Sequence, residues 1–313
     1  MRRAQTAVRP SSNLEELQQK IQELKKKLNA VIVAHNYQRP EVQDVADFVG
    51  DSLELARRCA EIEAEIIVFC GVRFMAETVA ILNPSRTVLL SHPTAGCPLA
   101  DMITVEDVRD WKASYPQATV VAYVNTTATI KAESDICCTS ASGVKVVESV
   151  PNNEILFIPD QHLGHYISTK TEKRVILYPG FCATHARLNA KQVKLARRLH
   201  PEAEVLVHPE CRAEVIALAD AALSTSQMIR YAKESPASSF LVGTEEGILH
   251  PLRGANPGKG FHLIASSLIC PDMKKTRLET VIETMELKQN VVTVPEGIRP
   301  KAKQAIDRML AIA

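Results

Sequence analysis

The sequence predicts an α/β fold: three similar domains with parallel sheets flanked by helices, around a pseudo-threefold axis with the site at the centre. The first supporting observation is a series of short apolar runs separated by helix-like stretches. Continuous apolar runs are typical of parallel strands that are buried on both faces. The runs lie at 30–34, 66–69, 88–90, 119–124, 155–158, 175–177, 205–207, 240–242 and 263–264. An amphipathic helix precedes them, because leucine and isoleucine recur at spacings of three and four at Leu14, Leu17, Ile21, Leu24 and Leu28.

The second observation is an internal repeat. Three sets of residues are separated by 88 and 85 positions, or by 85 and 88: His35, Tyr123 and His208; Ser52, Ser140 and Thr225; and Cys97, Cys182 and Cys270. Three residue classes with one period indicate three units of about 85 to 90 residues. We expect a first domain of 1–95 plus 272–313, a second of 96–183 and a third of 184–271.

Composition and charge exclude several classes of partner. The chain has 37 Lys and Arg against 36 Asp and Glu, a formal net charge of +1. It therefore lacks the basic field that holds nucleic acid. No stretch reaches the roughly 18 apolar residues that span a bilayer, and no signal-peptide core follows the first arginines. We expect a cytoplasmic protein that binds neither nucleic acid nor membrane.

The repeat also predicts a shared cavity, because polar groups at the carboxyl ends of parallel strands face one crevice. His35, Tyr123 and His208 end equivalent strands, so three units around one axis would place them together. Glu210 and Tyr37 each follow a strand-end histidine by two residues, which makes them a candidate general base and a candidate proton relay. The structural alternatives are that Glu210 caps a helix, and that plain N-capping explains the hydroxyls of Ser140, Ser224 and Thr225.

The eight cysteines are too sparse for a disulfide scaffold, and no CxxC pair is present. Cys97, Cys182 and Cys270 lie in turn-like loops that contain glycine or proline. Three thiolates from separate segments suit an iron–sulfur cluster in which one iron has no protein ligand and acts as a Lewis acid. The competing candidates near the predicted cavity are Cys137, Cys138 and Cys211.

Longer strings cover most of the chain: AHNYQRPEVQDVADFVGDS (34–52), GCPLADM (96–102), AYVNTTATIKAESDICCTS (122–140), GFCATH (180–185), HPEC (208–211), STSQMI (224–229), GTEEGILHPLRGANPGK (243–259) and CPDMKKT (270–276). On these strings the sequence strongly resembles the quinolinate synthase family. That family condenses iminoaspartate with dihydroxyacetone phosphate to give quinolinate, phosphate and water in NAD biosynthesis. The resemblance implies these two substrates, with L-aspartate oxidase as the supplier of iminoaspartate.

The resemblance also implies the site. It assigns a four-iron four-sulfur (4Fe-4S) cluster to Cys97, Cys182 and Cys270, and catalysis to Glu210, Tyr37 and His35. The implied substrate-binding residues are His35, Ser52, Tyr123, Asn125, Ser140, His185, His208, Glu210 and Thr225. The departures from the family pattern concern loop geometry rather than ligand identity: Ala183, Leu223 and the run Ala141, Ser142 and Gly143, together with the absence of a C-terminal cysteine pair.

Two other functions compete with this one. The same cavity would suit a zinc-dependent aldolase or hydrolase that uses His35, His185 and His208. A non-enzymatic iron–sulfur sensor or small-molecule binding module would need the cysteines but not a general base.

Overall fold

The computed structural model describes residues 12–312, which contain three four-stranded parallel sheets. Their strand orders are β2-β1-β3-β4, β6-β5-β7-β8 and β10-β9-β11-β12, so one order repeats three times. The strands are β1 (Ala30–His35), β2 (Phe48–Gly50), β3 (Ile66–Cys70), β4 (Thr87–Leu90), β5 (Thr119–Tyr123), β6 (Ile136–Cys138), β7 (Glu154–Ile158), β8 (Arg174–Leu177), β9 (Glu204–Val207), β10 (Ala221–Ala222), β11 (Ser239–Gly243) and β12 (Gly260–Leu263). This confirms the α/β class and three similar units; the pseudo-threefold axis stays a prediction.

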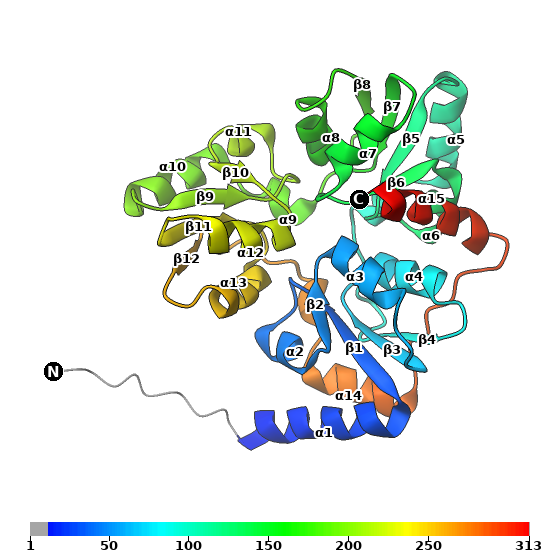
Figure 1. Ribbon diagram of the computed structural model, residues 1–313, viewed down its shortest axis with the longest axis vertical. Coiled ribbons are helices and arrows are strands. Elements are labelled where there is room, and N and C mark those ends of the chain that lie inside the picture. Colours follow the sequence, from blue (N-terminus) through cyan, green and yellow to red (C-terminus); the bar gives the residue numbers. More distant parts are fainter. Residues whose placement is uncertain (1–11, 313) are drawn as a thin grey trace.

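Helices flank each sheet, and Figure 1 shows the three sheets with their helices as separate lobes. The α-helices are α1 (Ser12–Leu28), α2 (Pro40–Val45), α3 (Ser52–Cys59), α4 (Arg73–Leu82), α5 (Val105–Ser114), α6 (Ala128–Glu133), α7 (Gly143–Ser149), α8 (Gln161–Ser168), α9 (Ala183–Ala186), α10 (Ala190–Leu199), α11 (Ala213–Ile216), α12 (Thr225–Glu234), α13 (Leu249–Ala255), α14 (Leu278–Leu287) and α15 (Arg299–Ile312). Three short 3-10 helices are η1 (Ala100–Met102), η2 (Glu246–Ile248) and η3 (Met273–Lys275). Among residues 12–312, no helix has both the length and the apolar character needed to cross a membrane.

Every predicted apolar run overlaps a strand, although the last is displaced, because β12 is Gly260–Leu263 rather than 263–264. The prediction missed β2, β6 and β10. Each of these lies at the edge of its sheet and has only two or three residues. A segment this short shows no apolar run of its own, so pairing with the neighbouring strand defines it.

An aspartate repeats at the same place in each unit. The side chains of Asp47, Asp135 and Asp220 accept the backbone N–H groups of Ile32, Val120 and Val205 at 2.8, 2.8 and 2.7 Å. These aspartates are separated by 88 and 85 positions, as the strand-end residues are. Each one ties the segment before an edge strand to the first strand of its sheet. The repeat therefore extends to the way in which each sheet is built.

The C-terminal helices divide between two units. Helix α14 packs on α1 and contacts β3 and β4. Helix α15 packs instead on α6 and β6. The reason is its apolar face, which is buried in the core of the second sheet through Ala302, Ala305, Ile306 and Met309. Residues 299–312 thus differ from the predicted grouping of 272–313 with the first domain, and the remaining domain boundaries stay predictions.

Candidate active site

A cavity of about 160 Å³ lies among the loops that follow the strands of all three sheets. All of the residues predicted to be catalytic, substrate-binding or metal-ligating line it: His35, Tyr37, Ser52, Cys97, Tyr123, Asn125, Ser140, Cys182, His185, His208, Glu210, Thr225 and Cys270. The structure therefore brings together side chains that are up to 235 positions apart in the sequence. Their chemical roles stay predictions.

Glu210 is the central charge of the cavity and is only 3% exposed. One of its carboxylate oxygens, Oε2, lies 2.9 Å from Nδ1 of His185 and 3.1 Å from Nδ1 of His208. The other, Oε1, accepts a hydrogen bond from Asn125 Nδ2 at 3.4 Å. Burial alone would raise the pKa of Glu210, but the two histidines outweigh burial and hold that pKa below its ordinary value. The carboxylate is therefore ionised and able to accept a proton.

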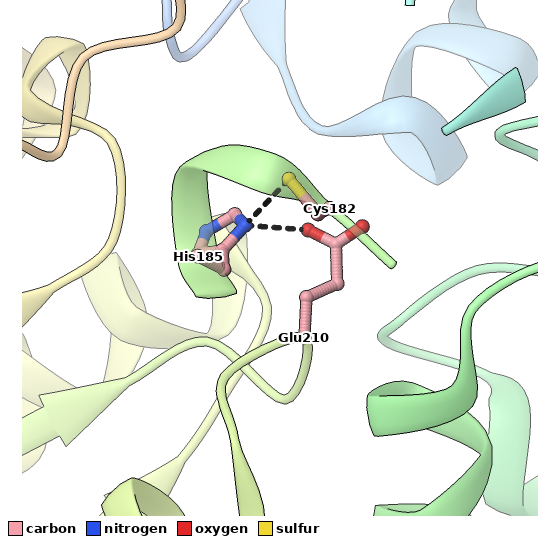
Figure 2. Close-up of side chains that lie close together, drawn as sticks. All are labelled: Cys182, His185 and Glu210. Carbon is pink, nitrogen blue, oxygen red and sulfur yellow. Dashed lines mark hydrogen bonds and ion pairs between the residues drawn. The ribbon is translucent and has the colours of Figure 1, made fainter. Parts of the chain in front are cut away.

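Glu210 does not cap the next helix, so the structural alternative for this residue is wrong. Helix α11 begins at Ala213, its N-cap residue is Arg212, and no side chain caps it. Figure 2 shows the Glu210 carboxylate turned toward the short helix α9, where it meets His185. The orientation of Glu210 therefore serves the cavity rather than the helix.

A chain of polar contacts links Glu210 to Tyr37. His185 Nε2 lies 2.7 Å from Thr244 Oγ1, which lies 2.6 Å from the Tyr37 hydroxyl. Burial, reinforced by the negative charge of Glu210, raises the pKa of Tyr37, so its phenol carries a proton. Thr244 was not predicted from the sequence and is fully buried after β11. The turn-like string GTEEG that contains it was the available signal.

His35 and Tyr123 extend the same wall of the cavity. Burial lowers the pKa of His35 to about 4, despite the opposing charge of Asp51, so the imidazole is neutral at neutral pH. Its Nδ1 accepts the backbone N–H of Tyr37 at 3.1 Å, which leaves the ring proton on Nε2. Burial raises the pKa of Tyr123, and the negative charge of Glu210 raises it further. Both side chains are therefore uncharged hydrogen-bonding groups.

The predicted hydroxyl residues lie close to helix N-termini, but neither Ser52 nor Thr225 is an N-cap residue. Helix α3 is capped by Asp51 rather than Ser52, and helix α12 by Ser224 rather than Thr225. The Thr225 hydroxyl instead accepts a hydrogen bond from Asn36 Nδ2 at 2.8 Å. N-capping therefore explains Ser224 but not Thr225, whose hydroxyl lines the cavity.

The third hydroxyl, Ser140, likewise does not cap a helix. Helix α7 begins at Gly143 and has Ser142 at its N-cap position. The Oγ atom of Ser140 lies 3.2 Å from Nε2 of His208, on the wall of the cavity. This contact joins the second unit to the third beside Glu210.

The eight cysteines divide into two groups, and all of them are free thiols. The three predicted ligands, Cys97, Cys182 and Cys270, are partly exposed and line the cavity. The other five are fully buried in the hydrophobic cores: Cys59, Cys70, Cys137, Cys138 and Cys211. The three competing candidates among them do not line the cavity.

Each cavity cysteine is followed by a short helical turn whose N–H groups point at its sulfur. Cys97 accepts from Ala100 and Leu99, Cys182 from His185, and Cys270 from Met273 and Asp272. Burial raises the pKa of all three thiols, that of Cys97 to about 12, while these N–H groups favour the thiolate. Backbone N–H donors around thiolates are typical of iron–sulfur sites. The donor set therefore fits an iron–sulfur cluster.

The structure does not assemble the three-histidine zinc site. Among residues 12–312, the metal-binding donor atoms that come within 4.8 Å of one another belong to Cys182, His185 and Glu210. Nδ1 of His185 lies 3.2 Å from the Cys182 sulfur (Figure 2). The sulfurs of Cys97 and Cys270 lie outside this group. In a cluster each thiolate binds a different iron, so three ligand sulfurs need not come this close to one another.

Three α/β units with parallel sheets surround a thiol-lined cavity that contains a buried ionised carboxylate, and these are the features of an α/β enzyme. The family model of the quinolinate synthetase A proteins matches residues 19–311. A protein named quinolinate synthase from Dehalococcoides mccartyi (strain ATCC BAA-2266 / KCTC 15142 / 195) is 54% identical over 293 residues, which cover 94% of this chain and 97% of the relative. The quinolinate synthase of Methanoregula boonei is 52% identical and that of Geobacter metallireducens 50%, each over 296 residues that cover 95% of this chain and 98% and 97% of those relatives. The chain belongs to the quinolinate synthetase A family.

Proposed function

We propose that this enzyme makes quinolinate for NAD biosynthesis from iminoaspartate and dihydroxyacetone phosphate. A carbon–carbon bond forms between the two substrates and phosphate leaves. The substrate nitrogen then condenses with the remaining carbonyl carbon, and two waters are lost in total as the ring becomes aromatic. The observation that carries the proposal is that every residue matching the family's site lines one cavity in a chain that belongs to the family.

Glu210 acts as the general base that removes protons from carbon during condensation and dehydration. Its two histidine contacts keep it ionised, and Asn125 fixes its second oxygen. Tyr37 is the complementary acid, because its phenol stays protonated. Through His185 and Thr244 a proton taken up at Glu210 reaches the Tyr37 side of the cavity without entering bulk water.

The substrates are anions, and the hydroxyls of Ser52, Ser140 and Thr225 bind their carboxylate and phosphate groups. Ser52 and Thr225 are the first residues of α3 and α12, where the helix dipole favours negative charge. Asn125, Tyr123, His35 and His208 supply further hydrogen bonds. Iminoaspartate comes from L-aspartate oxidase, and the reaction takes place in the cytoplasm, where free thiols stay reduced.

Cys97, Cys182 and Cys270 hold a 4Fe-4S cluster with one iron that has no protein ligand. When bound, the cluster supplies a Lewis acid that polarises oxygen groups of the substrate. The partial exposure of the three thiols gives iron access to them. The N–H groups that point at their sulfurs stabilise the thiolate form that binds iron.

The test is anaerobic purification followed by an assay with oxaloacetate, ammonia and dihydroxyacetone phosphate. We expect quinolinate and phosphate in equal amounts, and about four irons and four sulfides per chain from the cluster stoichiometry. One equivalent of zinc without sulfide, together with no quinolinate, would instead support the zinc-dependent aldolase or hydrolase. A loaded cluster without quinolinate would favour a sensor or binding module.

A further inference from the structure

Asp160 is fully buried and connects a helix start to one of the cavity cysteines. It lies two residues after the end of β7. Its Oδ1 accepts the N–H groups of His162 and Leu163 at 2.8 Å each, which caps α8. Its Oδ2 accepts the N–H of Cys182 at 3.0 Å. One carboxylate thus fixes the backbone of Cys182 to the end of the second sheet.

Glu245 makes the corresponding contact in the third unit. It lies two residues after the end of β11 and is 1% exposed. Its Oε1 accepts the N–H of Cys270 at 3.1 Å and lies 3.0 Å from Lys274 Nζ. Its Oε2 accepts the N–H of Gly247 at 2.7 Å. The Lys274 ammonium also donates to the Tyr37 carbonyl at 2.8 Å, which connects this group to the first unit.

The two carboxylates occupy equivalent positions of the repeat. Asp160 and Glu245 are 85 positions apart, as Tyr123 and His208 are. The position 88 residues before Asp160 is Val72, which lies two residues after β3, is buried and also lines the cavity. A valine side chain accepts no hydrogen bond, so this position cannot fix Cys97 in the same way. The first unit therefore differs from the other two at this position.

We propose that Asp160 and Glu245 are positioning residues that hold Cys182 and Cys270, respectively, in the geometry in which they bind the cluster. The inference rests on the cluster of the proposed function. A cysteine whose backbone N–H is bonded to a buried carboxylate keeps its Cα in place, so only the side-chain torsion is left to adjust. Partners of this kind that orient metal ligands typically contribute 10- to 100-fold to metal affinity.

The test compares Asp160→Asn and Glu245→Gln with the exposed matched controls Asp110→Asn and Glu234→Gln. All chains are purified anaerobically, and the release of iron to a chelator is timed. We expect release to be about 10- to 100-fold faster in the two positioning variants and unchanged in the controls. The Asn and Gln side chains have the same size as the Asp and Glu side chains that they replace. If one of the two variants fails to fold, the other still tests the proposal.

A second measurement does not depend on the loaded cluster. After anaerobic removal of iron, alkylation by iodoacetamide is timed at each cysteine by peptide mass spectrometry. Asp160→Asn should speed alkylation at Cys182 alone, Glu245→Gln at Cys270 alone, and neither should change Cys97. Unchanged rates, or equal acceleration at all three thiols, would overturn the positioning role. A wild-type chain that binds no iron and sulfide would refute the cluster of the proposed function, while alkylation would still decide whether these carboxylates fix the cysteines.

Discussion

On the acid–base side of the cavity, Glu210, His185, Thr244 and Tyr37 form a continuous series of contacts between 2.6 and 2.9 Å. On the thiol side, Cys97, Cys182 and Cys270 lie on loops that follow the last strand of each sheet, and N–H groups of their own loops point at each sulfur. The residues of the first side contact one another directly, whereas the three cysteines of the second side would be linked by the proposed cluster. Substitutions on the acid–base side should therefore lower turnover without changing iron content, whereas substitutions on the thiol side should lower iron content.

The largest effect is expected on the thiol side. Cys97→Ser replaces a proposed cluster ligand that is partly exposed in the cavity, so we expect the purified chain to lack the cluster and to form no quinolinate. Iron and sulfide analysis with visible absorption measures the loss. Cys59→Ala is the control, because that thiol is buried in the core of the first unit away from the cavity. A Cys97→Ser chain with a full cluster and full activity would exclude Cys97 as a ligand.

The next largest effect is expected on the acid–base side. Glu210→Gln removes the base but keeps the size of the side chain, so turnover should fall by about 10²- to 10⁴-fold. Iron and sulfide content should stay at the wild-type level, which is the contrast with Cys97→Ser. The exposed neighbour Glu214, changed to Gln, is the matched control. Undiminished turnover in Glu210→Gln would remove Glu210 from the mechanism.

A smaller effect tests whether the contact chain itself carries protons. Thr244→Val removes the hydroxyl that lies between His185 and Tyr37 and preserves side-chain shape. We expect kcat to fall by about tenfold, the equivalent of one hydrogen bond of roughly 1.4 kcal/mol. KM and iron content should not change, and Thr244→Ser should restore most of the activity. If Thr244→Val keeps the wild-type kcat and pH profile, protons reach Tyr37 by another route.

The strands with long apolar runs could be predicted from local patterns, because a buried strand needs consecutive apolar residues. The repeat indicated some of the cavity residues, because strand-end polar groups mark the sheet edge, and the family resemblance implied the full set. The short edge strands β2, β6 and β10 were missed because they are defined by the strand beside them. The position of α15 was also missed, since an apolar helix face in the sequence does not show which of the neighbouring cores it packs against.

Thr244, Asp160 and Glu245 were missed for a related reason. Each has its role through a partner far away in the sequence: Tyr37 for Thr244, Cys182 for Asp160 and Cys270 for Glu245. In sequence, each looks like an ordinary polar residue after a strand. The available signal was the period, because Asp160 and Glu245 are separated by the same 85 positions as the recognised sets.

The smallest effect concerns stability on the acid–base side rather than turnover. Burial lowers the pKa of His35 to about 4, whereas an unfolded histidine titrates near 6.5. Between these values the unfolded chain binds a proton that the folded chain does not, so the free energy of unfolding should fall as pH falls from 6.5 to 4. His35 contributes up to ~3 kcal/mol of this dependence. His208, whose pKa burial also lowers, contributes in the same direction.

Urea unfolding of the iron-free chain at several pH values measures this dependence, and His35→Gln should reduce it to the part that His208 contributes. His92→Gln, at a loop position outside the cavity, is the control and should leave the slope unchanged. A stability curve for His35→Gln that keeps the wild-type slope below pH 6.5 would mean that the imidazole is charged in the folded protein. The neutral wall beside Glu210 would then be lost, and the carboxylate would face a charged His35.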